Sequence, residues 1–133
     1  MNIELIDIPK IINKEGNIAV LENGVVPFEI KRVYYLYDIP STSKRGGHAH
    51  KKLNQILIAI SGSFDVVLKD GTDKEVITLN KPDKGLLITN NIWRELDNFS
   101  SGAVCLVLAS EVYDEDDYIR SYKSFVSYIK TNK

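Results

Sequence analysis

Short turn signals recur along the whole of this 133-residue chain, and they restrict it to a fold built from short strands. Turns rich in glycine, asparagine and aspartate separate β-branched and aromatic runs at 18–21, 30–37, 55–60, 64–68, 74–79, 85–88 and 104–109. The Asp70-Gly71 pair is a hairpin signal, because it tolerates the positive φ that tight hairpin turns need. Many short strands at such intervals predict an antiparallel sandwich or barrel.

The end of the chain follows a different pattern. Apolar and aromatic side chains recur there at helical spacing, namely Tyr118, Ile119, Tyr122, Phe125, Val126 and Ile129. Acidic residues at 114–117 and Lys130 near the end match the helix dipole, and Asp114 with Asp117 resembles a capping box. We predict a helix from about Glu115 to Ile129, packed on the β-domain. With no repeat or linker in between, residues 1–133 are predicted to form a single domain.

Composition narrows the range of partners. The net charge is −1, so no general field attracts nucleic acid. No apolar stretch is long enough to span a bilayer, and the first residues lack the features of a secretion signal. The single cysteine, Cys105, lies in an apolar run and is predicted to be a buried thiol. We expect a cytoplasmic protein that binds neither nucleic acid nor membrane.

The chain has only two histidines, in the tripeptide His48-Ala49-His50. In a β-strand, residues i and i+2 point to the same face, so both imidazoles are expected on one side of a strand. Basic residues flank them at 44–45 and 51–52. Two groups that titrate near neutrality, set among cations, favour an anionic ligand that undergoes proton chemistry. The alternative is a pair of structural histidines on a basic turn.

A His-x-His pair on a β-domain raises the question of a metal site. Cupin barrels combine this pair with a following acid and a late histidine, and here Gln55 and Arg94 stand at those positions. Arginine has no lone pair to donate, and a catalytic zinc normally takes three protein ligands. We therefore predict no metal and no other cofactor. Without metal, an imidazole can act as a general base, while a second imidazole or a guanidinium stabilises the oxyanion beside it.

Four segments of the chain, at 27–35, 45–55, 92–95 and 107–120, resemble the dTDP-4-keto-6-deoxy-D-glucose 3,4-ketoisomerases. The resemblance implies an all-β, cupin-type antiparallel β-barrel (jelly roll) with a C-terminal α-helix. It also implies a metal-free, dimeric isomerase of bacterial deoxyamino-sugar synthesis, as used in lipopolysaccharide or S-layer glycans. The enzyme would move the ketone of a dTDP-linked sugar from C4 to C3. A PLP-dependent aminotransferase would act next in the pathway.

By this resemblance, His48 and His50 are the catalytic residues. We predict that His50 takes the C3 proton to give an enediolate, and that His48 orients it or moves protons between the two oxygens. Arg32 and Arg45 are predicted to clamp the diphosphate bidentately. The remaining candidate substrate contacts are Tyr35, Tyr37, Lys52, Asn54, Gln55, Trp93 and Arg94.

Several of these candidates also have a purely structural interpretation. Tyr35 and Tyr37 could pack in the barrel, Trp93 could be a core aromatic residue, Gln55 could close the barrel floor, and Lys52 could be a solvated turn residue. The face of C4 that is reprotonated, and so a galacto or gluco product, stays open. Two other functions also stay open: a non-enzymatic nucleotide-sugar-binding cupin and a metal-dependent cupin enzyme.

The first residues suggest how the chain assembles. Residues 2–8 alternate between polar and apolar, with Ile3, Leu5 and Ile8 available for burial. Such a terminal strand either covers its own sheet or adds to the edge of a neighbour's sheet. Because the resemblance implies a dimer, and two-fold symmetry is the commonest closed arrangement, we predict a homodimer in which this strand pairs across the interface.

Overall fold

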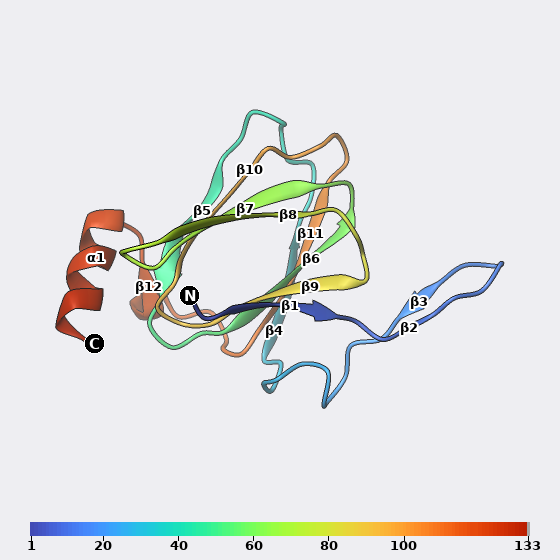
Figure 1. Cartoon of the computed structure of the whole chain (residues 1–133), viewed down its shortest axis with the longest axis horizontal. Helices are drawn as coiled ribbons and strands as arrows, with labels where there is room; N and C mark the ends of the chain where they lie inside the picture. The colour runs from blue at the N-terminus through green and yellow to red at the C-terminus, as the bar shows by residue number, and fades with distance from the viewer. Residues whose placement is uncertain (133) are drawn as a thin grey trace.

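Two antiparallel five-stranded sheets face each other in this computed structural model, which describes residues 1–132 (Figure 1). The first sheet has the order β1 (Ile3–Asp7), β9 (Lys84–Ile88), β6 (Gln55–Ser61), β11 (Val104–Ala109) and β4 (Arg32–Leu36). The second has the order β12 (Tyr118–Ile119), β5 (Arg45–His50), β10 (Trp93–Asp97), β7 (Phe64–Lys69) and β8 (Lys74–Leu79). The all-β class is confirmed, although the two sheets are not closed into one barrel.

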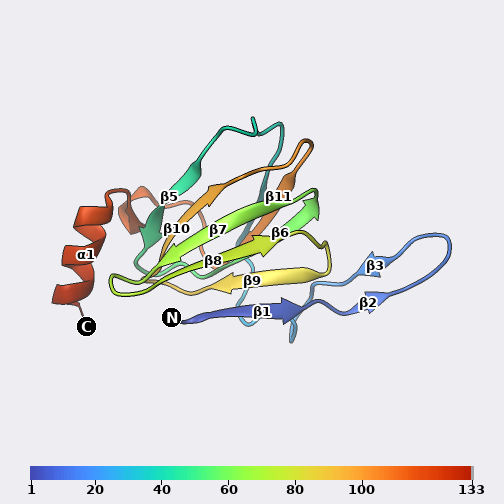
Figure 2. The same ribbon diagram turned by 45° about the horizontal axis from the view of Figure 1, so that its top comes forward.

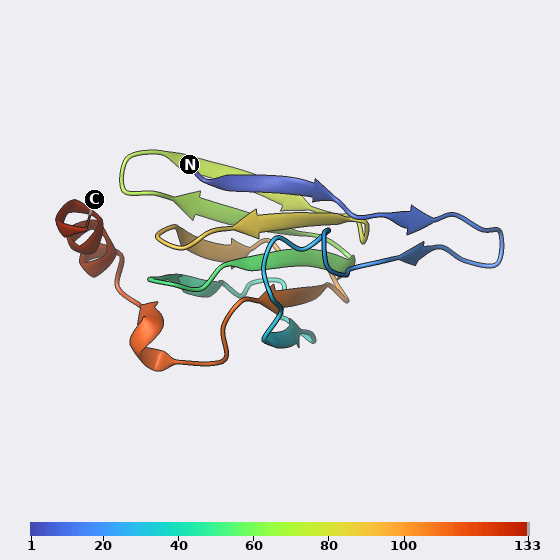
Figure 3. The ribbon, with the colours of Figure 1, turned by 90° about the horizontal axis from the view of Figure 1, so that it is seen from below.

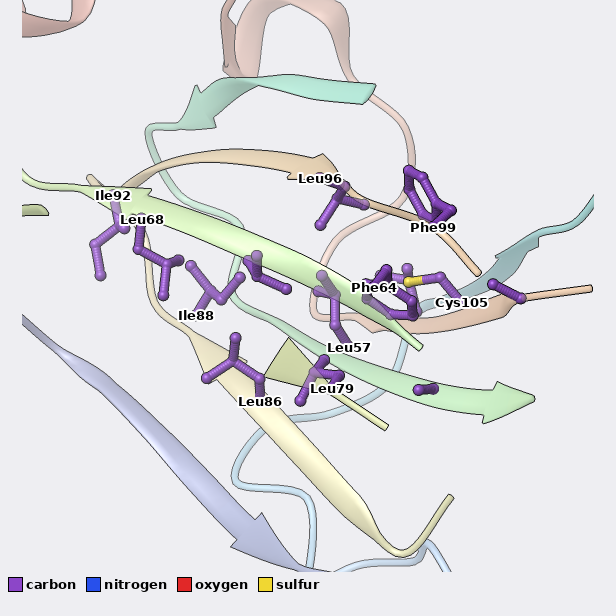
Figure 4. Close-up of a cluster of buried hydrophobic side chains, with 14 residues drawn as sticks. Leu57, Phe64, Leu68, Leu79, Leu86, Ile88, Ile92, Leu96, Phe99 and Cys105 are labelled. Atoms are coloured by element: carbon purple, nitrogen blue, oxygen red, sulfur yellow. The ribbon is translucent and has the colours of Figure 1, made fainter. Parts of the chain in front are cut away.

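The main hydrophobic core fills the space between these sheets (Figure 4). Strand β7 shows the reason, because Phe64, Val66 and Leu68 are fully buried while the residues between them are partly exposed. This is the period of two expected for a strand with one face on the core. Cys105 is buried in the same core, and burial raises the pKa of its thiol to about 12. Cys105 is therefore a packing residue, as predicted.

A second hydrophobic cluster covers the outer face of the first sheet. Ile56, Ile58 and Leu108 point away from the main core and pack against Ile8 and Val26. The segment 20–31, which leads to β4, crosses this face (Figure 3). Burial on both faces explains why β6 is an almost unbroken apolar run instead of an alternating one.

The C-terminal helix is present but shorter than predicted. Residues Glu115–Asp117 form a 3-10 turn, Tyr118–Ile119 form β12, and the helix α1 covers only Tyr122–Thr131. The backbone at 118–119 is extended because Tyr118 pairs with His50 and Ile119 with Ala49. Ser121 then begins the helix, its side chain accepting a hydrogen bond from the backbone N–H of Ser124. The helical spacing of Tyr118 and Ile119 was therefore misleading, since tertiary pairing decides their conformation.

The N-terminal strand β1 pairs antiparallel with β9 of its own chain, from Ile3 opposite Ile88 to Asp7 opposite Lys84. Because β1 is the edge strand of this sheet, its other side is unpaired in the chain, and the pairing across an interface stays a prediction. Ile8 is buried as expected, but Leu5 is 53% exposed. After β1, the short strands β2 (Lys10–Ile11) and β3 (Ile18–Ala19) form an arm that projects from the sheets (Figure 2). Among the described residues, no helix has the length and apolar character needed to cross a membrane.

Candidate active site

A cavity of about 310 Å³ opens between the two sheets. Alternate residues of each strand face it, so β4 contributes Arg32, Tyr34 and Leu36, while β10 contributes Arg94 and Leu96. The other lining residues come from β5, β6, β11 and the segment around β12, namely Arg45, Gly46, His48, Gln55, Leu57, Val107, Tyr118 and Arg120. The walls therefore combine an apolar interior with several cations and hydroxyl groups.

The two histidines lie on one face of β5 and contact each other directly. The Nε2 atoms of His48 and His50 are 3.1 Å apart, and the rings meet edge to face. His48 lines the cavity, whereas His50 is only 1% exposed and lies behind it. On its other side, Nδ1 of His50 is 3.1 Å from Oδ2 of Asp117. The three side chains form a row that runs from the cavity into the protein.

Burial lowers the pKa of both imidazoles. The pKa of His48 falls to about 2, through burial first and then through the positive charge of Arg94 and the neighbouring His50. The pKa of His50 falls to about 3, again through burial first and then through Arg94 and Arg32. Both rings are therefore neutral at pH 7 in the unliganded protein. Between two neutral rings, one must donate and the other accept in the 3.1 Å contact.

A buried guanidinium faces the same cavity. Arg94 is 1% exposed, and its Nε and Nη2 atoms donate to the carbonyl of Ile92 at 3.3 and 2.9 Å. Its Nη1 has no hydrogen-bond partner among the described residues, and neither has Oε1 of Gln55. Burial lowers the pKa of Arg94 to about 10, so the side chain still carries its charge at pH 7. Buried polar atoms normally have partners, so these two indicate a place for a polar ligand.

Further cations lie at the periphery of the cavity. Arg120 donates to both carboxylate oxygens of Glu115, at 2.6 and 2.8 Å, and stacks on the ring of Tyr118. Arg32 lies over Tyr34, and its buried Nε lacks a partner in the described chain. Arg45 is exposed at the start of β5. Three arginines at the rim, with a fourth deeper inside, make the cavity suited to an anionic ligand.

Comparison with known proteins identifies the family of this chain. Residues 1–130 match the family described as "FdtA: WxcM-like, C-terminal". A TDP-4-oxo-6-deoxy-alpha-D-glucose-3,4-oxoisomerase from Aneurinibacillus thermoaerophilus is 47% identical over 130 residues, which are 97% of this chain and 94% of that protein. The chain belongs to this FdtA family. The predicted resemblance is thereby confirmed, and so is the assignment to the isomerases.

Solved structures of 3,4-ketoisomerases match nearly the whole chain. A 3,4-ketoisomerase from Helicobacter canadensis is 45% identical, with a TM-score of 0.95 and 98% of both chains covered. A mutant of the 3,4-ketoisomerase QdtA from Thermoanaerobacterium thermosaccharolyticum, in complex with TDP-4-keto-6-deoxyglucose, is 42% identical with a TM-score of 0.96. That match covers 98% of this chain and 96% of the other.

Within this FdtA-family fold, two predicted tyrosines do not reach the cavity. Tyr35 and Tyr37 are 60% and 63% exposed, on the outer face of β4 and beyond its end. Alternation along the strand places Tyr34 and Leu36 inward instead. Tyr35 shares the strand face of Val33, which is opposite to the face of Arg32 that lines the cavity.

Three other predicted contacts have structural surroundings. Trp93 is buried against Phe125 of α1, and its Nε1 donates to Glu95. The Lys52 side chain is exposed on a turn, and Asn54 accepts a hydrogen bond from the backbone N–H of Asn90 through its side-chain oxygen. None of the three lines the cavity, whereas the predicted residues Arg32, Arg45, His48, Gln55 and Arg94 all do.

Four residues of the site are not among those predicted from the sequence, namely Tyr34, Asp117, Tyr118 and Arg120. Three of them lie in the acidic and aromatic segment that was interpreted as the start of a helix. A signal was present, since the whole segment from 113 to 120 forms part of the family resemblance. Among the described residues, no group of three or more His, Cys, Asp and Glu side chains could hold a metal ion.

Proposed function

We propose that this protein moves the keto group of dTDP-4-keto-6-deoxyglucose from C4 to C3 by acid–base catalysis between His48 and His50. The observation that carries the proposal is the neutral histidine pair beside a buried arginine in an arginine-rimmed cavity. A proton next to a ketone is removed most easily when a base acts on carbon and a cation faces the oxygen. The site supplies both, on the neighbouring strands β5 and β10, where Arg94 pairs with His48.

The placement of the two rings changes their expected roles. His48 lines the cavity and His50 lies behind it, so we assign the proton removal at C3 to His48 and not to His50 as predicted. The C3–H bond breaks, its electrons form the C3–C4 double bond, and O4 takes up the negative charge. The unpartnered Nη1 of Arg94 is the donor available to this oxyanion.

The second half of the reaction reverses these steps at the neighbouring carbon. The proton of the O3 hydroxyl passes to O4, which moves the negative charge to O3. Return of a proton from His48 to C4 then leaves the ketone at C3. No electron acceptor or metal is required for this sequence, because the substrate is oxidised at C3 and reduced at C4 by equal amounts.

The diphosphate of the substrate is assigned to the arginines of the rim. Arg32 and Arg45 both line the cavity, and a guanidinium binds phosphate oxygens in a bidentate fashion. The same binding affects the base, since burial first, and then the charges of Arg94, Arg120 and Arg32 among others, lower the pKa of His48 in the free protein. A bound dianion offsets these charges and raises that pKa toward the range of an effective base.

We further propose a cytoplasmic homodimer that supplies a PLP-dependent 3-aminotransferase in dTDP-amino-sugar synthesis. Support for association comes from two exposed apolar regions. Val33, Tyr35 and Tyr37 lie on and beside the edge strand β4, and Ile12 and Ile18 are more than half exposed on the arm. Apolar surface along an unpaired strand edge favours pairing with another chain.

A coupled reaction tests the proposed function. The protein is incubated with dTDP-4-keto-6-deoxyglucose, a 3-aminotransferase, PLP and glutamate, and the product is identified by NMR. We expect a 3-amino-3,6-dideoxy sugar that is absent when the protein is omitted. In D2O without the aminotransferase, we also expect deuterium at C3. If neither the amino sugar nor C3 exchange appears, the proposed function is wrong.

A further inference from the structure

Asp117 is a buried carboxylate that the predicted reaction does not use. It is 8% exposed and lies directly before β12, which pairs with β5 and so brings the carboxylate behind His50. Its Oδ1 accepts from the backbone N–H of Lys52 at 2.7 Å, and its Oδ2 accepts from that of Leu53 at 3.2 Å. A third contact joins Oδ2 to Nδ1 of His50 at 3.1 Å.

These contacts determine which nitrogen of His50 carries its proton. A carboxylate that receives two backbone N–H groups is an acceptor, so Nδ1 of His50 must be the donor in the third contact. The lone pair of neutral His50 is then on Nε2, which faces Nε2 of His48 at 3.1 Å. This contact needs one donor, so His48 carries its proton on Nε2. The lone pair of His48 is left on Nδ1.

We propose that Asp117 is a positioning residue of the isomerisation, which sets the tautomers of both histidines and stabilises a proton that arrives on His50. This inference rests on the proposed function and deepens it. When Nδ1 of His48 accepts the C3 proton, the proton on its Nε2 passes to Nε2 of His50. His48 becomes neutral again, and the positive charge lies on His50 beside the carboxylate. The reverse transfer returns a proton to the substrate carbon.

A purely structural role is the competing explanation, because Asp117 also holds the backbone of the turn at 51–53 through the Lys52 and Leu53 amides. The two roles differ in one observable, the protonation of the ring nitrogens. Long-range 1H–15N NMR of the 15N-histidine-labelled wild-type protein assigns this directly, and its only histidines are the two in question. We expect His50 protonated on Nδ1 and His48 protonated on Nε2. His50 protonated on Nε2 would overturn the inference.

The variant Asp117→Asn tests the consequence for the reaction. The new amide oxygen can still accept from Lys52 N. The NH2 group takes the place of Oδ2, so it loses the bond from Leu53 N, faces Nδ1 of His50 and forces the opposite tautomer. We expect kcat to fall by roughly 10²–10⁴-fold with KM changed by less than about threefold, because proton transfer and not substrate binding is affected. The NMR spectrum of the variant should show His50 protonated on Nε2.

The matched control is Asp116→Asn, which removes the same charge from the adjacent, exposed residue. It should leave kcat, KM and both tautomers unchanged. A wild-type kcat in Asp117→Asn would refute the inference. Should that variant fail to fold, the wild-type spectrum decides the tautomers alone. A wild-type protein that shows the expected tautomers but exchanges no C3 proton would refute the proposed function and leave the tautomer assignment intact.

Discussion

Two parts of the space between the sheets are buried by the same strands but differ in chemistry. In one part, Phe64, Leu79, Leu86 and Phe99 pack as a continuous apolar cluster. In the other part lie the histidines, Gln55 and Arg94, with buried Oε1 and Nη1 atoms that have no partner in the described residues. A buried polar group without a partner costs roughly 1–3 kcal/mol. The second part therefore lowers the stability of the free protein, and a bound polar ligand would remove this cost.

The change from one part to the other takes only two residues along a strand. Gln55 and Leu57 share a face of β6, and Arg94 and Leu96 share a face of β10. His50 is the last residue of β5. The functional side chains thus occupy the strand ends, while the apolar residues beyond them hold the same backbone rigid. A rigid frame of this kind positions reacting groups to within the small tolerance that catalysis needs.

The largest effect is expected on activity, from a substitution in the polar part. His48→Asn removes the group that faces the cavity, and we expect exchange of the C3 proton with solvent deuterium to slow by roughly 10²–10⁴-fold. Stability should hardly change, since the substituted residue is polar and only partly buried. Deuterium uptake followed by NMR, with circular dichroism for the fold, measures both. Near wild-type exchange in this variant would show that another residue is the base.

The apolar part should respond in the opposite way. Phe64 is fully buried and its ring lies 5.5 Å from that of Phe99, so Phe64→Ala leaves a cavity and is expected to cost about 3–5 kcal/mol of unfolding free energy. At a temperature where the variant is folded, kcat should remain within a few-fold of wild type. Chemical denaturation and turnover together check this. A large loss of kcat in folded Phe64→Ala would mean that the two parts are not independent.

The apolar part was easier to predict from the sequence than the polar part. The apolar strands and their turns were recognised because periodicity and Asp-Gly turn chemistry are local signals. The spacing of His48 and His50 was informative for the same reason, since a strand places i and i+2 on one face. The arginines at 32, 45 and 94 line the cavity as expected, although no position in the sequence reveals that Arg94 is buried.

The errors arose where distant segments meet. No local signal in the sequence indicates that Tyr118 pairs with His50. The spacing around Tyr118 therefore predicts a helix, and the contact of Asp117 with His50 is not predicted. Tyr34 lines the cavity and Tyr35 does not, because one residue in a strand moves a side chain to the other face. The pairing of β1 could not be decided either, because an alternating edge strand fits its own sheet and a neighbour's equally well.

Substrate binding should depend on Arg45 at the rim of the cavity and not on Lys52 on the turn. Arg45 lines the cavity while Lys52, seven residues on, does not. Arg45→Ala is expected to weaken dTDP affinity by about 1.5–3 kcal/mol, the range for a charge-assisted hydrogen bond. Lys52→Ala, the matched control, should stay within about 0.5 kcal/mol of wild type. Calorimetry measures the affinity of each variant for dTDP and for thymidine, which lacks the phosphates. Equal losses of dTDP affinity in Arg45→Ala and Lys52→Ala would place the diphosphate elsewhere.

The smallest effect is expected on the pH dependence of the unfolding free energy. The histidines have a pKa near 6.5 when unfolded, but burial and the nearby cations hold it at about 2 for His48 and about 3 for His50 in the folded protein. Between these values the unfolded chain binds protons that the folded chain does not. The unfolding free energy must therefore decrease as the pH falls from about 6.5 to the folded-state pKa values of the two histidines.

From pH 7.5 to pH 6, the two histidines together should lower the unfolding free energy by roughly 1–2 kcal/mol. Denaturation midpoints at several pH values measure this slope. Because these are the only histidines, the double variant with His48→Asn and His50→Asn isolates their contribution, and its slope should be flatter by that amount. Equal slopes in the wild type and the double variant would mean that the pKa values of the two histidines are the same in the folded and the unfolded protein. Burial and the nearby arginines would then not depress the pKa of the base in the free protein, and substrate binding would have no depressed pKa to restore.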